Sequence, residues 1–334
     1  MDQAPTVLLA PDEAVRHADA FLDRLEAETG PLVLATPGGQ GSDRHPARKL
    51  PWLGKRRWLA RLAPRRLLRL GAAPTVPAPE GTPAVWINAP VDADPALADR
   101  LLYADPTEGT PSREVTGDPV LCLEEPATGG DTDLCERFRE LREAGRWICY
   151  FAGTVEGEES RAYGAFFDLL RQRMGFMILA PRDPERYEPV YRDAIKYNLP
   201  TNRHNRLSTS WIPKKSRVYY VEDPETLAGI YPCADLVVPG GTLVGDGRTP
   251  DLATPLARGC AVAVGPAGRA HPVVASAVAA GAVAAAGDEE LEETLAALLT
   301  DPERREALAT AGQAWLRHHS GALERVLRAV KEAG

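Results

Sequence analysis

Residues 234–266, ADLVVPGGTLVGDGRTPDLATPLARGCAVAVGP, decide the expected fold. The apolar run 236–238 has the length of a buried parallel strand. Gly240 and Gly241 then break the run, as a turn with unusual dihedral angles requires. Asp251 is a candidate helix N-cap, and residues 261–264 form the next apolar run. The stretch therefore predicts a strand, a glycine turn, a helix and a second strand.

Loops of this kind bind anions in open α/β sheets. Unpaired backbone N–H groups and the helix dipole at the carboxyl end of the strand face the ligand there. We therefore expect Gly240, Gly241 and Thr242 to line an anion site. The alternative is an ordinary strand–helix turn that binds nothing.

Length and composition indicate a globular protein of two domains. The chain has 334 residues, of which 44% are hydrophobic and 26% charged, and single cores stop growing near that length. No apolar stretch approaches the roughly 20 residues that a membrane-spanning helix needs. The first residues carry neither a basic region nor a long apolar region, so no secretion signal is expected.

The cysteines and histidines show no pattern of a metal site. Five cysteines lie far apart without a CxxC pair, at positions 122, 135, 149, 233 and 260. This arrangement favours reduced thiols in a cytoplasmic protein over disulfides or metal ligation. Histidines such as His318 and His319 also lack ligand spacing and are expected at the surface or at helix caps.

The first half of the chain reads as one Rossmann-like domain, residues 1–126. Its opening predicts a strand, a helix and a strand, at residues 7–10, 12–27 and 31–35. A strand at 82–88, a short helix at 96–102 and a strand at 102–104 follow. Residues 124–133, which contain proline and glycines, are the expected linker.

The second half, residues 134–315, is a more regular alternation of strands and helices. Expected strands lie at residues 147–152, 176–180 and 217–221, in addition to the two in the opening stretch. Residues 288–330 are expected to be helical, and residues 316–334 to pack back on the first domain. Together the halves predict an α/β protein with two doubly wound domains that face a cleft.

A basic segment, residues 44–70, interrupts the first half. It holds ten Lys or Arg and no Asp or Glu, although the net charge of the chain is −8. Pro64 is expected to divide it into two short helices. A solvated helical hairpin and a nucleic-acid surface are alternatives, but no nucleic-acid motif accompanies it. Tryptophan and leucine among basic residues favour an anionic membrane surface, with contacts from Trp52, Lys55, Arg56, Arg57, Trp58, Arg61, Arg65 and Arg66.

Four stretches of the second half carry a family resemblance. They are AGTVEGEE at 152–159, LAPRDPERY at 179–187, YPCADL at 231–236, and GGTLV at 240–244 continuing to Gly265. They resemble the nucleotide-binding domain of the Kdo (3-deoxy-D-manno-octulosonic acid) transferases of lipid A assembly. The first half is collinear with that family but shorter.

The resemblance implies a GT-B glycosyltransferase that uses CMP-Kdo, inverts the anomeric centre and needs no metal or cofactor. It places the nucleotide at Pro181 and Arg182, at the segment Pro224, Glu225 and Thr226, and at Asp251 and Thr254. Gly153 and Thr154 form the second glycine turn, beside Gly240, Gly241 and Thr242. Arg182 is the expected phosphate or base contact. Its structural alternative is an ion pair with Asp183 or Glu185.

The acceptor hydroxyl needs a general base, and a carboxylate after the first strand suits that role. The resemblance implies Glu13, or Asp12 one residue earlier. A carboxylate that only serves the helix dipole is the alternative. The chain departs from the family pattern at three places: Thr254 replaces a carboxylate, Asn88 begins an altered acidic motif, and Pro119-Val120 replaces a lysine.

We therefore expect a transferase on the inner face of the cell membrane, cytoplasmic and peripheral. It would move an acidic sugar from a CMP donor to a lipid-linked or glycan acceptor, with no nucleic-acid partner. The alternatives are a catalytically silent nucleotide-binding or scaffold module, and a GT-B enzyme with another nucleotide-sugar donor.

Overall fold

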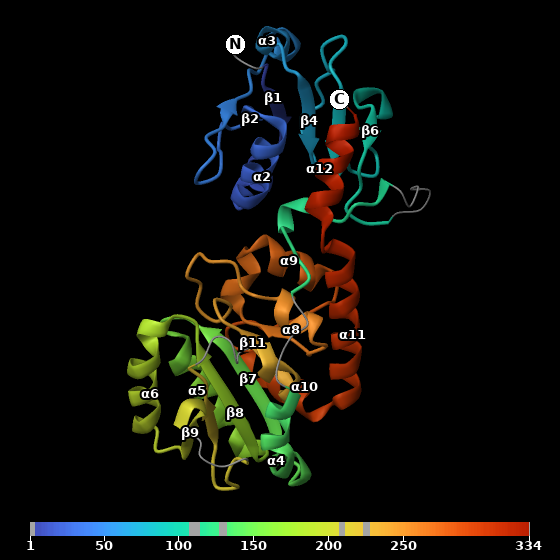
Figure 1. Cartoon of the computed structure of the whole chain (residues 1–334). Coiled ribbons are helices and arrows are strands. Elements are labelled where there is room, and N and C mark those ends of the chain that lie inside the picture. The colour runs from blue at the N-terminus through green and yellow to red at the C-terminus, as the bar shows by residue number, and fades with distance from the viewer. Residues whose placement is uncertain (1–3, 107–113, 127–131, 207–210, 223–227, 334) are drawn as a thin grey trace. The chain divides into compact units, whose positions relative to one another are not determined.

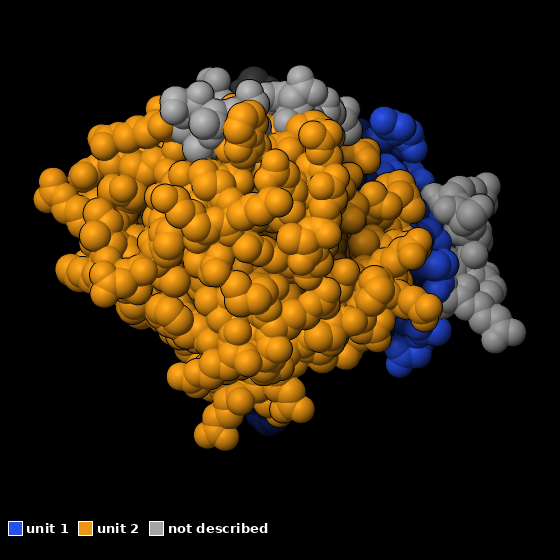
Figure 2. Space-filling view, turned by 90° about the horizontal axis from the view of Figure 1, so that it is seen from below, with its two compact units in different colours: residues 1–124, 318–334 blue, residues 125–317 orange. Residues whose placement is uncertain are grey.

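The computed structural model describes residues 4–106, 114–126, 132–206, 211–222 and 228–333. The chain divides into two compact units, residues 1–124 with 318–334 and residues 125–317, which Figure 2 colours separately. Each unit holds a parallel sheet of its own (Figure 1). The expected α/β class with two Rossmann-like units is confirmed. No helix within the described ranges combines the length and the apolar character of a membrane span.

Unit 1 is built on a six-stranded sheet of order β3-β2-β1-β4-β5-β6, with all neighbours parallel. Its strands are β1 Thr6–Leu9, β2 Leu32–Thr36, β3 Arg48–Lys49, β4 Arg66–Leu70, β5 Ala84–Ile87 and β6 Arg100–Leu101. The order reverses between β1 and β4, because the chain first adds strands on one side of β1 and then on the other. This reversal is the mark of a doubly wound sheet.

Helices cover both faces of this sheet. They are α1 Asp12–Val15, α2 Asp19–Thr29, α3 Lys55–Leu62 and the C-terminal α12 Ala322–Glu332, with 3-10 turns η1 Pro95–Leu97 and η3 Pro119–Leu121. One core joins α2 and α12, through Phe21, Leu25, Val326 and Val330, to β1 and β4. A second core holds Leu59 of α3. The C-terminal helix therefore belongs to the N-terminal unit.

The basic segment is not two helices. Residues 48–49 form β3 and residues 55–62 form α3. Residues 66–70 form β4, a central strand between β1 and β5. Arg69 is fully buried and donates to the carbonyl oxygens of Leu97 (2.6 Å) and Val76, with its guanidinium 5.6 Å from the centre of the Trp86 ring. Arg66 and Arg69 among leucines give this stretch the pattern of an amphipathic helix. The structure instead buries Arg69 in a strand, where backbone carbonyl groups of the same unit accept its hydrogen bonds. Burial lowers the pKa of Arg69 to about 10.

Two smaller expectations in unit 1 are also wrong. Residues 12–27 form two helices, because the carboxylates of Asp12 and Asp19 each bind the loop after β2. Residues 96–102 do not form a helix. The Asp99 carboxylate accepts a hydrogen bond from the Ala84 amide (2.7 Å), which aligns Arg100 and Leu101 as the edge strand β6.

Unit 2 is built on a five-stranded parallel sheet of order β11-β7-β8-β10-β9. Its strands are β7 Trp147–Thr154, β8 Gly175–Pro181, β9 Thr201–Arg203, β10 Val218–Tyr220 and β11 Leu236–Pro239. The pair β12 Ala263–Val264 and β13 Ala284–Ala285 continues beyond β11 through a bridge between Val237 and Val262. The strands in the opening stretch are therefore confirmed.

Helices also flank the sheet of unit 2. They are α4 Arg139–Glu143, α5 Glu158–Gln172, α6 Tyr187–Lys196, α8 Ala253–Ala257, α9 Pro272–Ala279, α10 Leu291–Thr300 and α11 Pro302–His319, with 3-10 turns η4 Thr132–Phe138, η5 Pro184–Arg186, η6 His204–Arg206, η7 Tyr231–Cys233 and η8 Pro266–Ala270. The helical spacing of Ala162, Phe166 and Leu169 buries one face of α5 against the sheet. The predicted helical character of residues 288–330 is confirmed by α10, α11 and α12.

A disulfide joins Cys135 and Cys233, which are 98 residues apart. The expectation that all five thiols are reduced is therefore wrong for this pair. The fold brings η4 against η7, and a contact over that separation leaves no trace in cysteine spacing. Cys122, Cys149 and Cys260 are free thiols.

Candidate functional site

The candidate site lies at the carboxyl edge of the sheet in unit 2. Strand order reverses there, because β8 lies on one side of β7 and the later β11 on the other. Ligands of open α/β sheets bind outside the carboxyl ends of the strands at this position. The two glycine bends lie at the ends of β7 and β11: Gly153 is the next-to-last residue of β7, and Gly240 with Gly241 follows β11.

The two glycine bends are in direct contact. A Cβ atom at Gly240 would lie 1.7 Å from the carbonyl oxygen of Gly153, so only glycine permits this approach. Gly153 and Gly241 also have φ values of +69° and +80°, in the left-handed region that side chains disfavour. This contact is consistent with the prediction that the two glycine turns lie beside each other in one site.

Arg182 lies against both bends. Its Nη2 donates to the carbonyl oxygen of Gly240 at 2.9 Å, and its backbone N–H donates to Thr154 at 3.0 Å. A Cβ atom at Gly153 would lie 3.8 Å from Nε. The ion-pair partner is Asp246, at 3.4 Å, and not Asp183 or Glu185 as the structural alternative held. The guanidinium thus bridges the ends of β7, β8 and β11.

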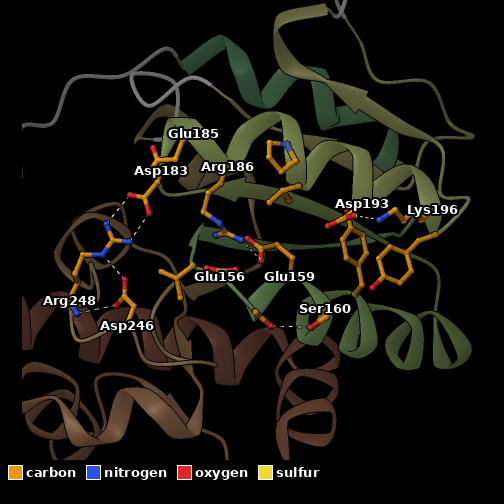
Figure 3. A pocket seen from close by; sticks show the side chains of 16 residues that line it. Glu156, Glu159, Ser160, Asp183, Glu185, Arg186, Asp193, Lys196, Asp246 and Arg248 are labelled. Atoms are coloured by element: carbon orange, nitrogen blue, oxygen red, sulfur yellow. Dashed lines mark hydrogen bonds and ion pairs between the residues drawn. The ribbon is translucent and has the colours of Figure 1, made fainter.

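A chain of charges connects the loop after β8 to the loop after β11 (Figure 3). Arg248 donates to both oxygens of Asp183, at 2.8 and 2.7 Å, and to Asp246 at 2.5 Å. The hydrogen bond from Arg248 holds the pKa of Asp183 below its usual value. Burial alone would raise the pKa of Asp246, but hydrogen bonds from Arg248 and the charge of Arg182 lower it. Both carboxylates therefore stay ionised.

A buried carboxylate occupies the amides of the glycine turn. Glu158, the first residue of α5, is fully buried. Its oxygens accept hydrogen bonds from the N–H groups of Gly241 (3.0 Å), Leu243 (2.7 Å), Val244 (3.0 Å) and Val155 (2.9 Å). The Gly240 amide donates instead to the carbonyl oxygen of Ala152 (2.8 Å). The expectation that the amides face a ligand phosphate is therefore wrong for Gly240 and Gly241, because both already have partners within the chain.

The other predicted nucleotide residues are placed in different ways. The Thr154 hydroxyl donates to Glu159 and the Thr242 hydroxyl to the carbonyl oxygen of Pro239, and both threonines are buried. Pro181 ends β8. The N-cap residue of α8 is Leu252 and not Asp251 as predicted, but the Asp251 carboxylate one residue earlier accepts from the amide of Thr254 at 3.0 Å. Pro224, Glu225 and Thr226 lie outside the described residues.

A groove of about 1020 Å³ opens beside the bends, between α5, α6 and the loop that carries Asp246 and Arg248. Figure 3 shows the labelled charged side chains arranged around it. Arg186 crosses the groove wall to Glu159 at 2.9 Å and also donates to the carbonyl oxygen of Thr154 at 3.2 Å. The groove is therefore rich in paired charges.

The two predicted bases lie after β1 in unit 1. Asp12 accepts from the amides of Gly38 (2.8 Å) and Gln40 (3.0 Å). Burial opposes the ionised form, but the hydrogen bonds of Thr36, Gln40 and Gly38 prevail and lower the pKa of Asp12. A carboxylate held in this way is a weak base. Glu13, the next residue, is exposed.

The predicted membrane residues separate into two groups. Trp52 is 87% exposed and Leu53 75% exposed, directly before α3. Arg56, Arg57, Arg61 and Arg65 are also exposed, whereas Lys55 and Trp58 are half-buried. Arg66 is buried in β4, so its assignment to a membrane surface is wrong.

One group in the described part of the chain has ligand-like proximity, Asp105 with His318 and His319. The Nδ1 atom of His319 accepts from the amide of Asp118 at 3.0 Å, and burial lowers its pKa to about 4. Its ring is therefore neutral, with the proton on Nε2, which lies 3.8 Å from Asp105. The Nε2 atom of His318 lies 2.7 Å from the carbonyl oxygen of Ala104 and 3.3 Å from Asp105. The Nε2 atom of each ring therefore faces an oxygen atom of the chain.

Sequence reasoning missed Glu158, Asp246 and Arg248. Glu158 had a visible signal, since a carboxylate directly after a glycine turn can bind amides as well as serve a helix dipole. The sequence of residues 245–248, Gly-Asp-Gly-Arg, did not indicate a functional role for Asp246 and Arg248, because a loop of glycines and charged residues usually faces solvent.

The chain was compared with family models, curated proteins and solved structures. No family model matches the chain. A curated 3-deoxy-D-manno-octulosonic acid transferase of Bordetella pertussis is 29% identical in an alignment over 194 residues, which covers 56% of this chain and 45% of that protein. The chain thus matches less than half the length of this relative.

Structural comparison also finds two solved structures of different description. The C-terminal CMP-Kdo binding domain of WaaA from Acinetobacter baumannii has a TM-score of 0.49 at 23% identity and covers 55% of this chain and 96% of that one. A putative UDP-N-acetylglucosamine 2-epimerase from Listeria monocytogenes has a TM-score of 0.41 at 15% identity and covers 99% and 97%. Over 56% of its length, the protein is therefore similar in sequence to a Kdo transferase.

Proposed function

We propose that the protein is a glycosyltransferase of the Kdo-transferase type, which moves an acidic sugar from a CMP-activated donor to a lipid-linked or glycan acceptor. The observation that carries the proposal is the position of Arg182 at the two glycine bends, where the strand order of unit 2 reverses. An arginine at this point suits a phosphate.

The geometry suggests how a cytidine phosphate would bind. The contact of Arg182 with Asp246 is 3.4 Å long, whereas Arg248 holds the same carboxylate at 2.5 Å. A phosphate oxygen would replace the longer contact and leave Asp246 with Arg248. Charge on the leaving phosphate would then be stabilised by the guanidinium, without a metal. Glu13 would remove the proton from the acceptor hydroxyl.

Nucleotide titration tests this proposal. Calorimetry of the full chain with CMP, UMP, UDP and GDP should show preferential CMP binding, and Arg182→Ala should weaken it by about tenfold or more, because a charge-assisted hydrogen bond is lost. Arg171→Ala is the matched control, since Arg171 is exposed and its ion pair among the described residues is the local one with Asp168. Unchanged CMP affinity in Arg182→Ala would place the nucleotide elsewhere.

A silent nucleotide-fold module is the second candidate, and one observation favours it. Glu158 already satisfies the glycine-turn amides, and Thr254 stands where the resembled family has a carboxylate. Absence of binding by all four nucleotides would support this candidate. Preference for UDP or GDP would instead indicate a transferase with another donor.

We further propose that the surface of Trp52, Leu53 and α3 docks on the inner face of the membrane, where the protein would be cytoplasmic and peripheral. Exposed tryptophan and leucine next to Arg56 and Arg57 suit the interface of an anionic bilayer. The Cys135–Cys233 disulfide is uncommon in a reducing compartment, so the cytoplasmic placement rests on the resemblance.

Vesicle co-sedimentation tests the docking surface. The protein should bind vesicles with phosphatidylglycerol more than phosphatidylcholine vesicles, and high salt should reduce that binding. Neutralising Arg56 and Arg57 to Gln should weaken it by about tenfold or more, since each basic residue near the surface contributes about 1 kcal/mol. Val91→Ala is the control, because Val91 is 73% exposed in the same unit. Equal binding to both vesicle types would refute the docking surface.

A further inference from the structure

The groove beside the glycine bends carries an excess of negative charge. It opens between α5 and α6, and Figure 3 shows its charged lining. Three cations line it, namely Arg186, Lys196 and Arg248. Six carboxylates do so, namely Glu156, Glu159, Asp183, Glu185, Asp193 and Asp246. An anionic ligand is therefore unfavourable here, and a cation is favoured.

The cations of the groove are already neutralised. Arg186 pairs with Glu159, Lys196 with Asp193, and Arg248 with Asp183 and Asp246. Glu156 and Glu185 are exposed and have no ion pair within the described segments. The excess charge is thus available to a ligand.

A buried hydroxyl provides an independent indication of a ligand. Tyr163 of α5 lines the groove and is 1% exposed, and its hydroxyl has no hydrogen-bond partner in the described structure. Burial and the nearby Tyr197, Glu159 and Asp193 raise the pKa of Tyr163, so its hydroxyl is neutral and close to two carboxylates. Buried polar groups without partners are rare in folded proteins.

The adjacent aromatic surface also suits a cation. Tyr197 stacks on Tyr163 with ring centres 4.4 Å apart and an interplanar angle of 24°, and it is 39% exposed. An ammonium group near such a ring gains a cation–π contact. The Asp193 carboxylate is accessible as well, because its side chain is 58% exposed. Its partner Lys196 is 76% exposed and lies three residues later on the same helix, and such surface pairs are weak.

We propose that this groove binds the ammonium group of a small amine, an amino sugar or a polyamine. The Tyr163 oxygen accepts a hydrogen bond from the ammonium, and Asp193 neutralises it after Lys196 moves aside. The ammonium contacts at Tyr163 and Asp193 do not include Arg182, although its partner Asp246 also lines the groove. The proposal stands whether or not the protein transfers a sugar.

Calorimetry of the full chain tests the site with glucosamine, N-acetylglucosamine, glucose and spermidine at low salt. Glucosamine or spermidine should bind, while N-acetylglucosamine and glucose should not, because neither carries a charge. Asp193→Asn and Tyr163→Phe should each weaken amine binding by about tenfold. Asp168→Asn is the matched control, since Asp168 lies on α5 outside the groove and pairs with Arg171.

Binding of glucosamine and N-acetylglucosamine with equal affinity would overturn the proposal, as would unchanged amine affinity in both variants. The Tyr163→Phe variant keeps the ring and its stacking, so its far-UV circular dichroism should match the wild type. CMP titrated into the same samples separates the two sites. A loss of CMP binding bears on the proposed transferase, whereas a loss of amine binding bears on this groove alone.

Discussion

Replacement of Glu158 by alanine should lower the free energy of unfolding of unit 2 by about 3–5 kcal/mol. The carboxylate accepts hydrogen bonds from four backbone amides in a site without solvent access. Its removal leaves these donors unsatisfied and opens a cavity between α5 and the glycine turn. Urea denaturation followed by circular dichroism measures the loss.

Two matched variants separate the amide contacts from a general effect of helix charge. Glu158→Gln keeps one oxygen acceptor and should cost less than Glu158→Ala. Glu156→Ala removes an exposed carboxylate two residues earlier and should change the stability by less than about 0.5 kcal/mol. If Glu158→Ala and Glu156→Ala unfold alike, the bound carboxylate contributes nothing to the turn.

Loss of the Cys135–Cys233 disulfide is the second change with a large expected effect. The cross-link closes a loop of 98 residues, and a loop of that length restricts the unfolded chain by about 4–5 kcal/mol in the chain-entropy account. Cys135→Ser should therefore lower the free energy of unfolding by about 2–5 kcal/mol. Urea denaturation with and without a reducing agent measures this difference.

The reducing agent provides an internal control for the cross-link. It should destabilise the wild type to the level of Cys135→Ser and leave that variant unchanged. Cys122→Ser, which removes a free thiol in unit 1, should retain the full response to reduction. A wild type that is indifferent to reduction would contradict the presence of the cross-link in solution.

The regular parts of the fold could be predicted from local sequence. Apolar runs such as residues 236–238 and 176–180 are buried on both faces in parallel sheets, and their length and bounding glycines identify them. Strand β4 was missed because its arginines mimic an amphipathic helix. Only the tertiary structure supplies the carbonyl groups of Val76 and Leu97 that bind Arg69.

The sequence predicted some of the residues that lie at the candidate site, but not the hydrogen bonds and ion pairs that these residues make. The glycine bends and Arg182 have recognisable sequence contexts, and the structure brings them together. The partners of these groups come from elsewhere in the chain: Asp246 lies 64 residues after Arg182, and Glu158 lies 83 residues before Gly241. Contacts over such separations depend on strand order, which local periodicity does not reveal.

The buried carboxylate of Glu158 means that the loop after β11 is shaped before any substrate arrives. In many phosphate-binding loops the incoming anion orders the backbone, and the entropy cost of ordering the loop reduces the free energy of binding. Here the protein carries a permanent substitute for that anion, and the bend keeps its curvature when empty. Encounter with a nucleotide should therefore leave the backbone of this bend unmoved, and specificity must arise from the side chains around it.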